Sequence, residues 1–199
     1  MPGKRRSTKG LPPVPREYIV QLVKRALEHW PEPLGLRNAA LIALTYLSGR
    51  RASEVLALKR DQVRLMPGYM VLLNVRILKR FVKDRETGEK KPVVENISIP
   101  VRDDDPLVQV VRAYLDWYDR EKPGWENLWG IRTRQRFWQI VREIDPEIWP
   151  HWLRHQRASH LAQVLNPFEL REKMAWAKLD TAIEYVHSVA DKKIREAGI

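Results

Sequence analysis

Three short segments of the chain hold side chains that could carry chemistry. They are residues 51–54 (Arg-Ala-Ser-Glu), residues 151–155 (His-Trp-Leu-Arg-His) and the stretch 176–185, which begins with a tryptophan and ends with a tyrosine. A guanidinium stays protonated and can hold anionic oxygens bidentately. An imidazole exchanges protons near neutral pH, and a deprotonated phenol is a nucleophile. Together these groups suit chemistry at an anionic centre.

Each segment also has an ordinary structural explanation when taken alone. Arg51 and Glu54 are three residues apart, so on a helix they could form a solvated ion pair. His151 and Arg154 share a helix face in the same way and could pair with neighbouring acids. Tyr185 shares its face with apolar residues, which is typical of a buried structural tyrosine. The segments therefore have to be weighed together.

No metal site is indicated. His151 and His155 have the spacing of two zinc ligands, but no glutamate lies between them and no further ligand is evident. The run Asp103–Asp105 could suggest a two-metal nuclease, yet acids at the start of a helix are ordinary partners of its dipole. The absence of cysteine excludes disulfides, Cys-ligated zinc and a thiol nucleophile. We expect chemistry without metal or cofactor.

The composition indicates a basic globular protein. The 199 residues include 36 Lys and Arg against 25 Asp and Glu, a net charge of +11. This excess favours a polyanionic partner, most commonly nucleic acid. No apolar run is long enough for a membrane span, and no signal peptide is evident. We expect a cytoplasmic protein that binds a polyanion.

The elements that must position these residues are mainly helical. Apolar residues three and four apart predict a helix from Pro15 that ends at Trp30–Pro33. An almost wholly apolar stretch predicts a buried helix at 36–48, which Gly49 ends. Val- and Ile-rich stretches at 69–78 and 93–101 predict a β-hairpin with a charged loop at 83–92 and a short first strand at 62–65.

Capping residues and apolar spacing predict the remaining helices. They are expected at 52–58, after the cap Asp105 with Pro106 at its first position, at 132–144, at 151–165, after the cap Asn166, and after the cap Asp180. From Ala190 we expect a charged tail, helical at 191–197. The fold class is mainly α with a small antiparallel β-sheet (α+β).

In their order and spacing, Arg51-x-x-Glu54, His151-x-x-Arg154-His155 and Tyr185 resemble the catalytic domain of the tyrosine recombinases, the phage-integrase family. Typical members read Thr-Gly-Leu-Arg-x-Ser-Glu, then His-x-Leu-Arg-His, then a tyrosine nine residues after the histidine of Leu-Gly-His. Trp176 takes that histidine position here, as in a minority of active members. Arg50 replaces an apolar residue, and the spacing to Glu54 favours Arg51 as the catalytic arginine. The resemblance spans about residues 12–190.

The resemblance implies site-specific DNA cleavage and rejoining, with Tyr185 as the nucleophile of a 3′-phosphotyrosyl intermediate. Two arginines, Arg51 and Arg154, would hold the phosphate oxygens, and Trp176 would donate its indole N–H there. His151 would donate to the phosphate or help to deprotonate the nucleophile. Glu54 would support Arg51.

The resemblance also implies a lysine general acid in the hairpin. Lys79 lies nearest the family position, and Lys83 is a rival. Basic residues expected to contact DNA are Lys83, Lys90, Lys91, Arg132, Arg134 and Arg136.

Residues 1–11 are expected to form a flexible basic tail, either a solvated terminus or a phosphate-binding arm, and residues 12–199 the catalytic domain. The helical DNA-clamping domain that precedes it in most members is expected to be absent. Double-stranded DNA is the expected partner, with self-association into a tetramer on DNA. Two alternatives stay open: a type IB topoisomerase-like enzyme that relaxes DNA, and a non-cleaving DNA-binding module on the same fold.

Overall fold

A computed structural model describes residues 13–84 and 86–197, without the side chains of Lys79 and Lys192. The predicted tail at 1–11 lies outside these residues. The described helices are α1 (Arg16–His29), α2 (Leu34–Ser48), α3 (Ala52–Leu56), α4 (Pro106–Glu121), α5 (Arg134–Ile144), α6 (Pro150–Leu161), α7 (Pro167–Lys173) and α8 (Leu179–Ala197), with a 3-10 turn at Arg60–Gln62. The strands β1 (Val63–Met66), β2 (Tyr69–Lys83) and β3 (Lys90–Pro100) form one antiparallel sheet in that order. The predicted fold class is confirmed.

Helix α2 is the centre of the main core. Nearly all of its residues are buried, and α1, α4 and α6 pack around it. Gly49 ends it in the left-handed conformation at φ 60°, with its N–H donating to the Thr45 carbonyl at 3.1 Å. The buried central helix and its glycine stop are therefore as predicted.

The predicted caps Asp105 and Asn166 are present, and several helix boundaries differ from the prediction. The Asp105 carboxylate accepts from the Leu107 N–H, and Asn166 caps α7 with a complete capping box. Helix α8 begins at Leu179, so Asp180 lies in its first turn and is not its cap. Helices α3 and α6 end earlier than expected, at Leu56 and Leu161. Within the described residues, no helix is long and apolar enough to cross a membrane.

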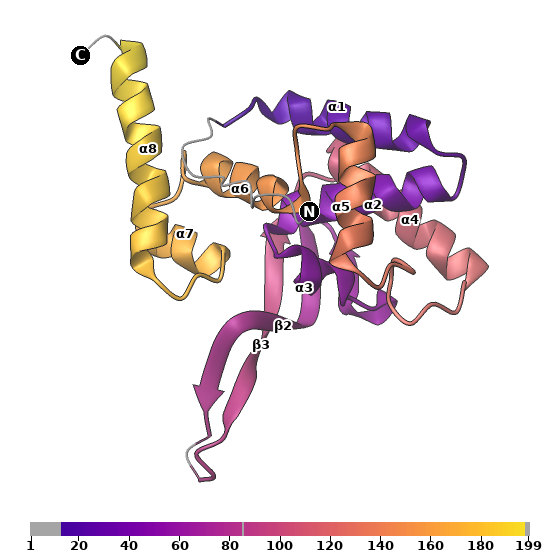
Figure 1. Cartoon of the computed structure of the whole chain (residues 1–199), viewed down its shortest axis with the longest axis horizontal. Helices are drawn as coiled ribbons and strands as arrows, with labels where there is room; N and C mark the ends of the chain where they lie inside the picture. The colour runs from indigo at the N-terminus through magenta and orange to yellow at the C-terminus, as the bar shows by residue number, and fades with distance from the viewer. Residues whose placement is uncertain (1–12, 85, 198–199) are drawn as a thin grey trace, which may run out of the picture.

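The β2–β3 hairpin is longer than predicted and projects from the helical body (Figure 1). Its strands pair from Tyr69 with Pro100 out to Lys83 with Lys90, so they take up part of the stretch expected as a loop. The pairing is irregular between Ile77 and Phe81. Such an irregularity frees backbone groups of β2 for contacts outside the sheet.

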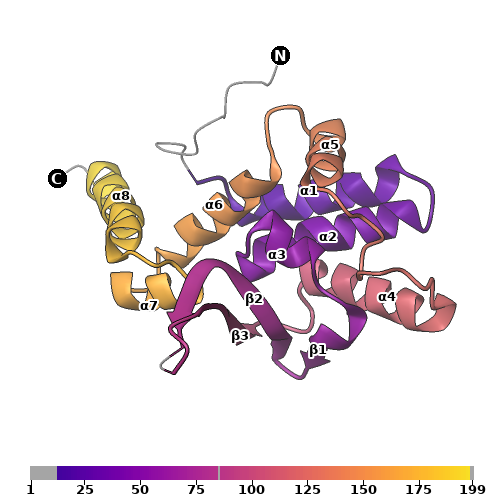
Figure 2. The ribbon, with the colours of Figure 1, turned by 60° about the horizontal axis from the view of Figure 1, so that its bottom comes forward.

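Helix α8 is one continuous helix, so the helix expected at 191–197 is confirmed as its last part, and the separate charged tail expected from Ala190 is wrong. It stands at one end of the molecule beside α7, clear of the main core (Figures 1 and 2). A second, small apolar cluster attaches α8 to α6 and α7; its buried members are Ala158, Ala162, Leu170, Met174 and Ala182. This cluster determines where Tyr185 lies.

Candidate active site

The turn between α2 and α3 positions Arg51. The Glu54 side chain is fully buried, and its two oxygens accept from the Arg51 backbone N–H at 2.8 Å and from Arg51 Nη1 at 2.9 Å. Arg51 Nη1 also donates to the Leu78 carbonyl, and the Leu78 N–H donates to Glu54, both at 2.9 Å. The irregular part of β2 thus supplies the backbone groups that fix this pair.

Arg50, the neighbouring arginine, is tied to backbone. Its Nε donates to the Ser48 carbonyl at 3.2 Å, and its Nη2 donates to the carbonyl of Lys173. Burial lowers the pKa of Arg50 to about 10. Arg50 therefore joins the α2–α3 turn to the end of α7, whereas the Arg51 side chain keeps 24% of its surface exposed.

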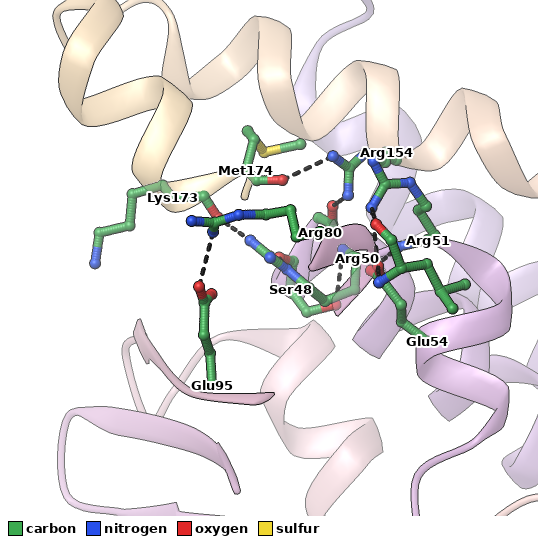
Figure 3. A network of polar contacts seen from close by, with 11 residues as sticks. Ser48, Arg50, Arg51, Glu54, Arg80, Glu95, Arg154, Lys173 and Met174 are labelled. Carbon is green, nitrogen blue, oxygen red and sulfur yellow. Dashed lines mark hydrogen bonds and ion pairs between the residues drawn. The ribbon is translucent and has the colours of Figure 1, made fainter. Parts of the chain in front are cut away.

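Arg154 comes from the middle of α6 and is only 3% exposed. Its Nη1 donates to the Gly49 carbonyl and its Nη2 to the Met174 carbonyl, each at 2.7 Å. Burial, followed by the nearby charges of Arg51 and Arg50, lowers the pKa of Arg154 to about 9. Figure 3 shows these arginines converging from α6 and the α2–α3 turn. The result is a largely desolvated, positively charged cluster beside which a bound anion would be stabilised.

Tyr185 lies half-buried in the second turn of α8, next to this cluster. Its hydroxyl is 2.7 Å from Nδ1 of His155, and its ring stacks on Trp176 at 5.1 Å between centroids. The guanidinium carbon Cζ of Arg154 lies 5.9 Å from the centroid of the same indole ring. Burial raises the pKa of Tyr185 to about 12, and the charge of Arg154 opposes that shift. The Tyr185 hydroxyl therefore stays protonated near neutral pH.

The loop between α7 and α8 brings Trp176 to this place. Ala175 adopts a left-handed backbone conformation at φ 49°, which is uncommon for a residue with a side chain. Trp176 also borders a pocket of about 470 Å³ between the hairpin and α7. Arg80 and Arg171 are among the residues that line it. A pocket lined by two arginines, one glutamate and apolar side chains thus opens beside the tryptophan.

The two histidines of residues 151–155 are placed differently. His151 is exposed in the first turn of α6, while His155 is only 7% exposed and contacts Tyr185. The contact of His155 with Tyr185 was not among the sequence expectations. It joins residues 30 positions apart, so no local spacing could signal it.

The predicted DNA-binding lysines of the hairpin lie near its tip, away from the arginine cluster. Lys83 and Lys90 are exposed at the ends of β2 and β3, and Lys91 pairs with Asp84 at 2.6 Å. Lys79 belongs to β2 directly after Leu78, but its side chain lies outside the described part of the chain. Lys83, Lys90 and Lys91 therefore lie toward the tip of the hairpin, whereas Arg80 of β2 lines the pocket beside Trp176.

Three further arginines lie at and before the start of α5. Arg132 Nε lies 3.5 Å from Glu126 Oε2, and Arg136 Nη1 lies 3.4 Å from Glu143 Oε1. Arg134 is exposed. Asp104 and Asp105, at the start of α4, pair with Arg102 and Arg16. Among the described residues, no group of three His, Cys, Asp or Glu could hold a metal ion.

Known proteins resemble the chain in sequence. The profile of the phage integrase family matches residues 15–192. Tyrosine recombinase XerD of Oceanobacillus iheyensis is 30% identical, over 77% of this chain and 51% of its own length. XerD of Listeria innocua is 29% identical, over 78% and 51%. The chain spans about half the length of these curated relatives.

Solved structures resemble it in fold. The XerH site-specific recombinase in a post-cleavage complex with palindromic difH substrate matches with a TM-score of 0.67 and 17% identity, over 98% of this chain and 55% of that one. The XerA recombinase matches with a TM-score of 0.62 and 17% identity, over 94% and 65%. At this identity the likeness concerns the fold alone.

Proposed function

Because the chain belongs to the phage integrase family, as a tyrosine recombinase catalytic domain, we propose that it cleaves and rejoins DNA at specific sites through a 3′-phosphotyrosyl intermediate on Tyr185. One observation carries the proposal: the side chains of Tyr185, Arg154 and Trp176 lie next to one another although they come from three separate segments. A nucleophile beside buried guanidinium groups suits attack on a phosphodiester.

The residues divide the chemistry as follows. Attack by Tyr185 on phosphorus adds negative charge to the non-bridging oxygens, and Arg51 and Arg154 hold those oxygens. The Trp176 indole N–H donates to one of them. His151, exposed at the start of α6, donates to the phosphate from the solvent side. The new phosphotyrosyl bond keeps the energy of the broken bond for rejoining, so the reaction as proposed uses neither ATP nor metal.

The departing 5′ oxygen needs a proton, and we assign the general acid to the hairpin. Lys79 is the first candidate because its neighbour Leu78 is bonded to both Arg51 and Glu54. Lys83 is the second candidate. The exposed Lys83, Lys90, Lys91, Arg132, Arg134 and Arg136 are proposed to bind the DNA backbone, which predicts binding that weakens with salt.

Double-stranded DNA is the proposed partner, and a tetramer on DNA the proposed assembly. Helix α8 supports the second part, because its last turns extend past α7 at one end of the molecule (Figure 1). Ile194 in these turns is 49% exposed. Such a segment could pack on a neighbouring copy.

A covalent-trapping experiment tests the function. Labelled nicked duplexes are incubated with the protein in EDTA, and protein-bound DNA is resolved on a denaturing gel. The wild type should give a protease-sensitive shifted band, and Tyr185→Phe should give none while binding DNA nearly as well. Tyr46→Phe is the matched control, because it removes the other hydroxyl that contacts a histidine of α6.

Two results would redirect the proposal. DNA binding without a covalent band, across many duplexes, would favour the non-cleaving DNA-binding module. A covalent band together with relaxation of supercoiled plasmid, but no strand exchange between duplexes, would favour the topoisomerase-like enzyme.

A further inference from the structure

We infer that His155 accepts the phenolic proton of Tyr185 when that hydroxyl attacks the phosphodiester, an inference that rests on the function proposed above. The distance from Tyr185 Oη to His155 Nδ1 is 2.7 Å, that of a formed hydrogen bond. With the phenol as donor, Nδ1 is the acceptor, so the imidazole is neutral and carries its proton on Nε2. This is the starting arrangement of a general base.

Other bases near the nucleophile are less suited to the task. The two oxygens of Glu54 are already taken by Arg51 and Leu78. Glu184, next to Tyr185 in the chain, is exposed on α8, as is His151 on α6. Of the bases that the structure describes, His155 is the one with a hydrogen bond to the reacting oxygen.

The proton balance closes within the site. The Tyr185 proton moves to His155 Nδ1, the Oη–P bond forms and the P–O5′ bond breaks, and the 5′ oxygen takes a proton from the hairpin general acid. The imidazolium then lies beside the phosphate, whose charge stabilises it. In rejoining, the 5′-hydroxyl returns its proton to the hairpin group as it attacks phosphorus, the P–Oη bond breaks, and the released phenolate recovers its proton from His155. One imidazole therefore serves both directions.

The protein contains its own control for this pair. On the same helix, His160 Nδ1 lies 2.7 Å from the Tyr46 hydroxyl, and His160 Nε2 lies 2.6 Å from the Val14 carbonyl. Tyr46 is fully buried in the main core. The Tyr46–His160 pair therefore has the same side-chain types and the same distance as the Tyr185–His155 pair, but its role in the core is structural.

The substitution His155→Asn separates a proton acceptor from a positioning residue. The asparagine carbonyl oxygen can take the place of Nδ1 and accept the same hydrogen bond, but it cannot take up the proton. We expect adduct formation on a nicked duplex, in a single turnover with enzyme in excess, to slow by roughly 100-fold or more. DNA affinity should stay within about threefold, and His160→Asn, the matched control, should leave the rate within about threefold.

A second measurement distinguishes lost basicity from disturbed packing. Fluorotyrosine at position 185 has a more acidic phenol and depends less on a base. It should recover much of the rate lost in His155→Asn, which a packing defect would not allow. If circular dichroism shows that His155→Asn does not fold, His155→Gln takes its place.

The outcomes are separable. An unchanged rate in His155→Asn, a loss that fluorotyrosine does not recover, or an equal loss in His160→Asn would overturn the role of His155 and leave the proposed function standing. No adduct with the wild type, while DNA is bound, would overturn the proposed function and this inference with it.

Discussion

Arg154 donates a hydrogen bond to the backbone carbonyl of Met174 at 2.7 Å, so a side chain of α6 fixes the loop that leads into Trp176. The other end of the same guanidinium holds Gly49, in the turn before Arg51. One buried group therefore sets the distance between the two loops that border the pocket. Its structural role and its proposed role in catalysis are inseparable in this arrangement.

Arg154→Ala should consequently impair both activity and stability. Loss of one donor to the phosphate oxygens should slow adduct formation by roughly 100- to 1,000-fold. The unpaired carbonyls of Gly49 and Met174 should lower the free energy of unfolding by about 1–3 kcal/mol. Single-turnover assays and urea titrations measure the two effects. Arg120→Ala, an exposed arginine of α4, should change neither, and an active Arg154→Ala would contradict the pocket.

Glu54→Gln should loosen Arg51. The carboxylate accepts from three donors, whereas the amide that replaces one oxygen brings hydrogens toward the Arg51 donors. We expect a loss of about 1–3 kcal/mol in the free energy of unfolding and slower adduct formation with DNA binding preserved. Glu121→Gln, an exposed α4 carboxylate, is the control. Equal rates in the two variants would show that Arg51 needs no such support.

Trp176 should act through its indole N–H. Trp176→Phe keeps an aromatic ring to stack on Tyr185 but removes the donor, so adduct formation should slow by roughly 10- to 100-fold. Trp176→His restores an N–H and should recover part of the rate. Trp117→Phe, which changes a tryptophan stacked on Tyr114 in the main core, is the control. A Trp176→Phe variant as fast as the wild type would limit the residue to packing.

Stability should depend on pH through His160. Burial lowers its pKa below the ordinary 6.5, so the folded protein holds it neutral where the unfolded chain binds a proton. Unfolding therefore takes up a proton, and the free energy of unfolding should fall as pH decreases from about 7 through 6.5. Urea titrations across this range should give a shallower fall for His160→Asn. Parallel curves for both proteins would contradict this source of the pH dependence.

The sequence predicts the elements best where they pack on the core. The apolar stretch at 36–48 became α2, and the caps Asp105 and Asn166 mark real helix starts. The larger errors lie where elements leave the core. The outer hairpin is charged and exposed, so no apolar periodicity distinguishes it from a loop, and none marks α8 as continuous through the exposed Ala190.

The candidate site divides along a similar line. The Arg51–Glu54 pair is local, and its three-residue spacing anticipates the contact. The attachment of Arg154 to Gly49 and Met174, and the contact of His155 with Tyr185, depend on how α6 lies against two distant loops. Only tertiary packing brings such groups together, so these contacts cannot be predicted from the spacing of the residues along the chain.

The assignment of the general acid is tested with a better leaving group. A duplex with sulfur in place of the bridging 5′ oxygen releases a thiolate, which leaves without being protonated. Lys79→Ala should cleave an ordinary duplex slowly and this duplex at nearly the wild-type rate, whereas Lys83→Ala should show no such selective recovery. The opposite pattern would transfer the role to Lys83. If neither variant is rescued, the hairpin lysines contact phosphate only, and the proton for the 5′ oxygen comes from another group.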